Sequence, residues 1–152
     1  MQRLAMQRRG FLSLLLGSTV CLLLQPLTAL AALWNKAAFE ADKLNAASKI
    51  LTIDAAVAST DIQIIAPDRA ENGAVVQVEV NSNIANTDLI YILVENNPTP
   101  LIAQFAFSNG AQPYIVTRIK MAESADIKVV VKAGTQFFSH SKHVVVLENG
   151  CG

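Results

Sequence analysis

From about residue 62 onward the chain repeats one pattern, in which apolar and polar residues alternate over short runs that each end at a turn signal. The clearest run places Val76, Val78 and Val80 on one side and polar residues on the other, as in a strand with one buried and one exposed face. Asn-Gly pairs at 72–73 and 109–110 mark turns. Seven runs are predicted as strands: 62–64, 76–81, 90–94, 102–107, 114–121, 126–132 and 137–147. Seven short strands at close spacing favour an antiparallel β-sandwich, so the fold class is mainly β.

A helix is predicted before the strands, over residues 34–51. Apolar residues recur there at helical spacing, at Trp34, Ala37, Ala38, Ala41, Leu44 and Leu51. The strands that follow leave open sheet edges, which a monomer must protect or a partner must cover.

The first 31 residues have the pattern of a twin-arginine export signal. Arg8 and Arg9 precede an apolar run that ends near Leu24, which is shorter than the roughly 20 residues that a membrane-spanning helix needs. Small residues at Ala29 and Ala31 predict cleavage before Ala32, so Cys21 would be removed with the signal. We therefore expect a periplasmic protein without a membrane span; the alternative is an N-terminal membrane anchor.

The expected mature part, residues 32–152, contains nine basic and twelve acidic residues. This mildly acidic balance argues against sequence-independent nucleic-acid binding, which needs a basic surface. Its 121 residues are enough for a hydrophobic core without disulfide bonds.

Patterns typical of catalysis are missing from the sequence. The glycines at 73, 110 and 134 stand alone, so no glycine-rich phosphate loop is present. His140 and His143 are three residues apart on a predicted strand, which places them on opposite faces and disfavours a shared metal ion. We expect a binding or carrier module rather than an enzyme, with no metal and no cofactor.

The last five residues, 148–152, form a different kind of segment. Cys151 is the only cysteine outside the signal, and it stands between Gly150 and Gly152. Small flanking residues let a chain end enter the cleft of another protein, and chain ends are mobile unless they are held. We expect a flexible C-terminal arm whose cysteine is a covalent handle. The alternative is an exported scaffold or adhesion module in which Cys151 forms only an intermolecular disulfide.

Four segments of the chain form a recognisable set: 34–39, 66–76, 117–121 and 150–152. The most specific of them are the run around Asn72-Gly73-Ala74 and the tail with Cys151. Together these segments resemble the SoxY family, the sulfur carriers of the Sox thiosulfate-oxidising system, and the resemblance spans essentially the whole chain. The family's usual tail is Gly-Gly-Cys-Gly-Gly, whereas this chain has Asn149-Gly150-Cys151-Gly152.

The resemblance implies three regions: a signal peptide (1–31), an immunoglobulin-like sandwich with an N-terminal helix (32–147) and a carrier arm (148–152). It implies that Cys151 bears the sulfur and that Gly150 and Gly152 give the arm its flexibility. It also implies a heterodimer with the small β protein SoxZ. Transient partners would be a haem-containing enzyme that couples thiosulfate to the cysteine, a hydrolase that releases sulfate and, in some systems, a sulfane dehydrogenase.

Overall fold

The computed structural model describes residues 35–148, and the elements below are those of this part of the chain. It contains two short helices followed by nine strands. The helices are α3 (Lys36–Phe39) and α4 (Leu44–Leu51). The strands are β1 (Val57–Ala58), β2 (Ile62–Ile65), β3 (Arg69–Asn72), β4 (Val76–Ser82), β5 (Thr87–Val94), β6 (Leu101–Ala106), β7 (Tyr114–Ile119), β8 (Ala125–Ala133) and β9 (Gln136–Glu148).

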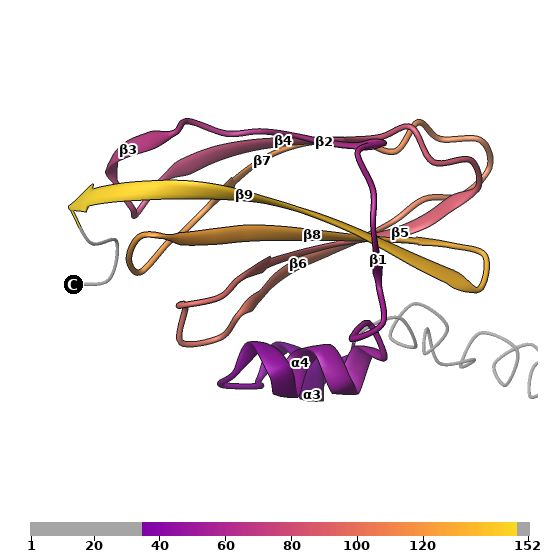
Figure 1. The fold of residues 1–152 in the computed structure, drawn as a ribbon, viewed down its shortest axis with the longest axis horizontal. Helices are drawn as coiled ribbons and strands as arrows, with labels where there is room; N and C mark the ends of the chain where they lie inside the picture. The colour runs from indigo at the N-terminus through magenta and orange to yellow at the C-terminus, as the bar shows by residue number, and fades with distance from the viewer. Residues whose placement is uncertain (1–34, 149–152) are drawn as a thin grey trace, which may run out of the picture. The chain divides into compact units, whose positions relative to one another are not determined.

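The strands form two sheets that pack face to face (Figure 1). The large sheet has the order β1-β9-β8-β5-β6, with β3 also paired to β9, and the small sheet has the order β2-β4-β7. The main core lies between them, and its largest fully buried side chains are Ile62, Val76, Val78, Val80, Ile90, Ile92, Val94, Ile127 and Val129, together with Met121. The predicted mainly β sandwich is confirmed.

The strand alternation is visible in β4, at the centre of the small sheet. Val76, Val78 and Val80 are at most 1% exposed, while Gln77 on the other side is exposed. β4 pairs antiparallel with both β2 and β7. Its three valines lie opposite Ile119, Thr117 and Ile115 of β7, and Val80 also lies opposite Ile64 of β2. This alternation buries one face of the small sheet and leaves the other uncovered.

Two of the nine strands were not among the seven that the sequence predicts. β1 and β3 are only two and four residues long, and both pair with the outer edge of β9. Both run parallel to β9, whereas the ladders among the strands predicted from sequence are antiparallel. β3 is Arg-Ala-Glu-Asn, a polar segment with no apolar alternation that could identify it as a strand.

The single helix expected over residues 34–51 is divided, with α3 ending at Phe39 and α4 beginning at Leu44. Ala38 and Ala47 are both fully buried in the same apolar cluster on the large sheet. Nine residues of continuous helix would rotate these two side chains by about 180° from each other. The break lets both alanines face the sheet.

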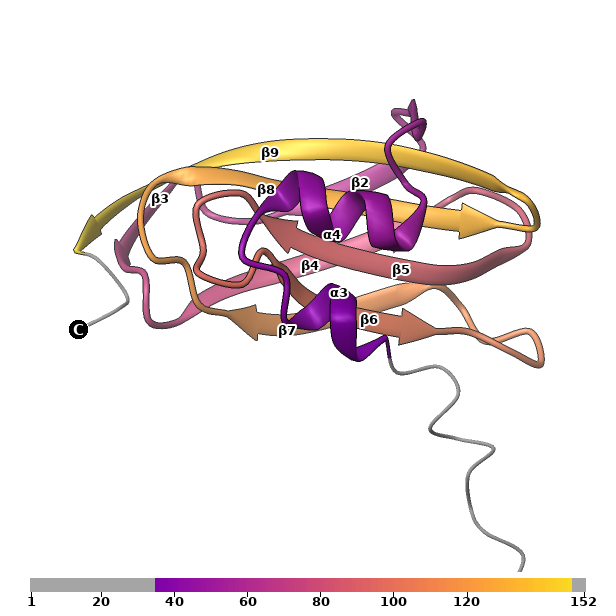
Figure 2. The same cartoon turned by 90° about the horizontal axis from the view of Figure 1, so that it is seen from below.

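The two helices cover the outer face of the large sheet (Figures 1 and 2). Their buried side chains pack on outward residues of β5, β6 and β8, and the cluster contains Ala38, Ala47, Leu51, Ile53, Tyr91, Leu93, Leu101 and Val130. Neither helix is long and apolar enough to cross a membrane.

Candidate functional site

The site residues predicted from sequence, Cys151 with Gly150 and Gly152, and the export residues Arg8 and Arg9, all lie outside the described residues. The structure does describe the strand that leads to the predicted arm. β9 is the longest strand and ends at Glu148, three residues before Cys151. The candidate site is therefore the end of the sandwich at which β9 finishes.

The last residues of β9 are held from one side by β3. Residues Arg69 to Asn72 pair with Val145 to Glu148. Beyond this ladder, the Gly73 N–H donates a hydrogen bond of 2.9 Å to the Glu148 carbonyl. The main chain is thus hydrogen-bonded through its last described residue.

Ser124 holds β9 from the other side. The ladder between β8 and β9 ends with the pair Ala125 and Val144, so β8 itself does not reach the end of β9. The Ser124 hydroxyl accepts a hydrogen bond from the Val146 N–H at 2.9 Å and donates to the Val146 carbonyl at 3.4 Å. The Ser124 hydroxyl therefore bonds the two main-chain groups of Val146 that a longer β8 would have bonded.

Asn97 ties the neighbouring loops together at the same end. Its amide donates to the Lys120 carbonyl at 2.7 Å and accepts from the Ala122 N–H at 2.8 Å. The Met121 N–H in turn donates to the Gly73 carbonyl at 2.8 Å, so the turn that binds Glu148 is itself bound. Neither Asn97 nor Ser124 was predicted from the sequence, because their hydrogen-bond partners are 22 to 25 residues away.

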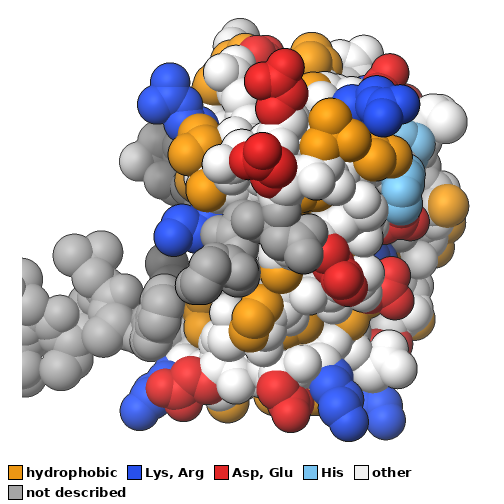
Figure 3. All heavy atoms as spheres, turned by 90° about the vertical axis from the view of Figure 1, so that its left-hand side faces the viewer, with side chains coloured by type: hydrophobic (Ala, Val, Ile, Leu, Met, Phe, Trp, Pro, Cys, Tyr) orange, Lys and Arg blue, Asp and Glu red, His pale blue; other side chains and the backbone are white. Residues whose placement is uncertain are grey.

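Figure 3 shows this end of the sandwich, with acidic and apolar side chains lying beside one another. Four exposed glutamates lie at the ends of the strands here, namely Glu71, Glu95, Glu123 and Glu148. The exposed Lys120 follows β7 at the same end. The exposed Arg69 lies on β3 beside the last residues of β9, so both carboxylates and cations surround the end of β9.

The two histidines lie on opposite faces of β9, as their spacing predicts. His140 pairs with the fully buried Val129 on the core side. His143 pairs with the exposed Asp126, and its Nδ1 lies 2.6 Å from Asp126 Oδ1. Within residues 35–148, no three His, Cys, Asp or Glu side chains come together to hold a metal ion.

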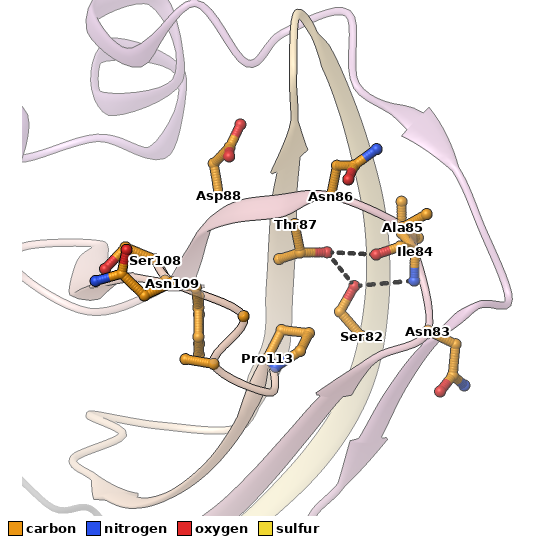
Figure 4. A pocket seen from close by; sticks show the side chains of 13 residues that line it. Ser82, Asn83, Ile84, Ala85, Asn86, Thr87, Asp88, Ser108, Asn109 and Pro113 are labelled. Carbon is orange, nitrogen blue, oxygen red and sulfur yellow. Dashed lines mark hydrogen bonds between the residues drawn. The ribbon is translucent and has the colours of Figure 1, made fainter.

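A pocket of about 450 Å³ lies at the opposite end of the sandwich, between the β4–β5 and β6–β7 connections (Figure 4). The Ser82 and Thr87 hydroxyls lie 2.9 Å apart, Thr87 donates to the Ile84 carbonyl, and Ser82 accepts from the Ile84 N–H. Asp88 accepts from the Gly134 N–H at 3.0 Å. The first three groups stabilise the β4–β5 connection from within, and Asp88 joins it to the β8–β9 turn, so we assign these polar groups a structural role.

Comparison with known proteins agrees with this fold. The sequence model of the family described as sulfur oxidation protein SoxY matches residues 47–151. The sulfur carrier protein SoxY from Chlorobium limicola f thiosulfatophilum has 34% sequence identity and a TM-score of 0.62; the match covers 68% of this chain and 96% of that one. Superoxide reductase (neelaredoxin) from Ignicoccus hospitalis has 18% identity and a TM-score of 0.47, over 56% of this chain and 79% of that one. No curated protein sequence matches the chain significantly.

Proposed function

Since this chain belongs to the SoxY family and is therefore a sulfur carrier in sulfur oxidation, we propose that the sulfur is carried on Cys151. Two observations support this assignment. Cys151 is the only cysteine in residues 32–152, and the family match extends to it. The observation that carries the proposal furthest is the fastening of β9, which gives the arm a fixed origin at Glu148.

The short distance in sequence between Glu148 and Cys151 limits where the thiol can act. Three residues of fully extended chain span at most about 10–11 Å. An enzyme that acts on Cys151 must therefore bring its active site close to this end of the sandwich. The small residues Gly150 and Gly152 leave room for the main chain in a narrow cleft.

The proposed cycle begins with oxidative coupling of thiosulfate. The Cys151 thiol and thiosulfate form a sulfur–sulfur bond to give the S-thiosulfonate Cys–S–S–SO₃⁻, and one proton and two electrons are released. The haem-containing partner enzyme accepts the two electrons. Oxidation is needed because a thiol and thiosulfate are each too reduced to form this bond alone.

The second step is hydrolysis by another partner enzyme. Water adds to the terminal sulfur of the adduct, the bond to the SO₃ group breaks, and the products are the persulfide Cys–S–SH and hydrogen sulfate. A sulfane dehydrogenase oxidises the remaining outer sulfur in systems that contain one. The carrier itself contributes the thiol and its presentation, and the partner enzymes contribute the catalysis.

The four exposed glutamates near the end of β9 fit this role. A thiosulfonate is an anion, and Glu71, Glu95, Glu123 and Glu148 disfavour its lying against the carrier's own surface. Repulsion of this kind favours arm conformations in which the adduct is offered to a partner. The effect is modest in water and is reduced by salt.

We further propose that the protein works in the periplasm as a heterodimer with a SoxZ-type subunit. The support for export is the Arg8-Arg9 pattern before an apolar run. Changing both arginines to lysine should stop periplasmic accumulation, as measured by immunoblotting of cell fractions. Normal export of the double variant would contradict the twin-arginine route.

The decisive experiment compares Cys151→Ser with the native chain in reconstituted thiosulfate oxidation. We expect the variant to keep its unfolding midpoint and to lose thiosulfate-dependent turnover completely. Intact-mass spectrometry of native protein from thiosulfate-grown cells should show sulfur adducts on Cys151 that a reducing thiol removes. Because Cys21 is expected to be removed with the signal, Cys21→Ser should turn over as the native chain does; a loss of turnover in this variant would contradict the removal of Cys21.

Turnover by Cys151→Ser at the native rate would refute the carrier role of this residue. A native protein that carries no adduct, and is instead a dimer that disappears on reduction, would favour the disulfide-linked scaffold.

A further inference from the structure

The end of β9 is supported at both of its edges, and one segment takes part in both supports. This segment is the connection between β7 and β8, residues 120–124. At one edge, the Ser124 hydroxyl bonds the N–H and the carbonyl of Val146. At the other edge, the Met121 N–H donates to the carbonyl of Gly73, and the N–H of the same glycine binds the last residue of β9. The position at which the proposed arm begins therefore depends on the β7–β8 connection.

The β7–β8 connection is itself held by two adjacent asparagines that follow β5. The Asn96 amide donates to the Ser124 carbonyl at 3.2 Å. Asn97 binds the Lys120 carbonyl and the Ala122 N–H, at 2.7 Å and 2.8 Å. Asn97 is only 9% exposed, so its bonds keep the connection in one geometry, because an unpaired buried polar group is costly. The two asparagines thus hold the connection near both of its ends.

Without the Ser124 hydroxyl, the end of β9 would have no support at its β8 edge, because the ladder with β8 stops at Val144. Cys151 is three residues after Glu148 and seven residues after Val144. Release of the last residues of β9 would therefore more than double the length of chain between the thiol and its last fixed point.

The length of this chain matters for every reaction at the thiol. An enzyme needs the reacting sulfur at one point, its active site. The chance of finding a tethered group at a given point falls roughly as the −3/2 power of the tether length. A tether of seven residues instead of three therefore lowers this chance about 3- to 4-fold.

We propose that Ser124 and Asn97 are positioning residues for the sulfur carried on Cys151, and that they act by keeping the arm short. The inference rests on the proposed function, since it requires that partner enzymes act on this cysteine. It adds two residues in the body of the sandwich that act on the reaction only through the main chain of β9.

The first test is amide hydrogen exchange in Ser124→Ala, with Ser82→Ala as the matched control. Ser82 lies at the opposite end of the sandwich, is 5% exposed and likewise accepts a hydrogen bond from a main-chain N–H, that of Ile84. Ser124→Ala removes the acceptor of the Val146 N–H, so exchange of this amide should become at least about 10-fold faster. Ser82→Ala should leave it at the native rate.

The second test is kinetic and uses reconstituted thiosulfate oxidation with the carrier as the varied substrate. At temperatures well below the unfolding midpoints, kcat/KM should fall about 2- to 4-fold in Ser124→Ala and in Asn97→Ala. Ser82→Ala should react as the native chain does, and Ser124→Thr, which keeps the hydroxyl, should restore the native value. Alkylation of Cys151 by iodoacetamide should be equally fast in all of them, because a small reagent reaches the thiol wherever the arm lies.

A longer arm separates reach from any direct contact between Ser124 and an enzyme. Insertion of four glycines after Glu148 should itself lower kcat/KM about 3- to 4-fold. In that background Ser124→Ala should have a smaller effect than in the native arm, because two changes that act on the same tether are not additive.

Three results would overturn the inference: the same kcat/KM in Ser124→Ala as in Ser82→Ala, native exchange at Val146 in Ser124→Ala, or a full additional loss in the lengthened arm. Failure of the carrier role gives a different result, namely native turnover by Cys151→Ser. The two failures are therefore distinguishable.

Discussion

The strands that form the two outer faces of this sandwich differ in how their apolar residues are arranged. β5 is apolar at every position from Leu89 to Val94, so its outward Tyr91 and Leu93 need cover just as its inward residues do. β4 alternates valine with polar residues, and its outward side needs no cover to remain in water. The comparison shows that the chain's own helices cover the face that could not remain exposed. The less apolar face remains available to another molecule.

The largest expected loss of stability comes from a substitution on the outer face of the large sheet, beneath the helices. Leu93 is fully buried beneath the helices, so Leu93→Ala should lower the free energy of unfolding by about 2–5 kcal/mol, through lost burial and the cavity left behind. Val116→Ala, on the uncovered face, should change it by no more than about 0.5 kcal/mol. Urea denaturation of the isolated chain measures both. Equal losses would mean that the outer face of the small sheet is also packed in the free protein.

A smaller loss of stability is expected from α4, and it should differ between the buried and the exposed side of this helix. Leu51 is 8% exposed and packs on the large sheet, whereas its neighbour Ile50 is 42% exposed. Leu51→Ala should cost about 2–3 kcal/mol, and Ile50→Ala about 0.5 kcal/mol or less. Thermal unfolding followed by circular dichroism would compare the pair. A larger loss for Ile50→Ala would show that the helix docks by its other side.

The smallest expected effect is a change in the pKa of Tyr114, on the outer face of the small sheet. The hydrogen bond that the Tyr114 hydroxyl donates to Glu79 is the main reason that the pKa of this phenol is raised above its ordinary value of 10.0. Phenolate absorbance should therefore develop at higher pH than for a free tyrosine, and Glu79→Gln should move the pKa back toward 10.0 because the negative charge is gone.

Tyr91 is the other tyrosine of the chain, so the measurement is made in a Tyr91→Phe background. A pKa of Tyr114 that is the same in Glu79→Gln as in the native chain would contradict the role given to this hydrogen bond.

The elements that could be predicted from the sequence are those whose pattern lies within a few neighbouring residues. Alternation along β4 and β8, and the turn residues between strands, are properties of a few neighbouring residues, and these elements were predicted correctly. β1 and β3 were not, because their pairing with β9 joins residues about 76–81 positions apart. The division of the helix was missed for a related reason, since only the sheet beneath determines that Ala38 and Ala47 must face the same way.

The candidate site also has a part that the sequence predicts and a part that only the folded structure reveals. A solitary cysteine between glycines is visible in the sequence and predicts a carrier arm, which stays a prediction because residues 149–152 lie outside the described part. The groups that fasten the origin of the arm, such as the Ser124 hydroxyl on Val146, are ordinary loop residues in sequence. Their role depends on contacts that exist only once the sandwich has formed.

The fastening of β9 at Glu148 has a kinetic consequence for the carrier role proposed for the Cys151 thiol. A group tethered within about 10 Å of a fixed point explores so small a volume that its effective concentration there is on the order of a tenth of a molar or more. An enzyme that docks on this end of the sandwich thus meets its substrate at a concentration far above that of free thiosulfate adducts in solution. Each enzyme in turn can bind the carrier weakly and release it quickly, because a high local supply of substrate replaces the need for tight binding.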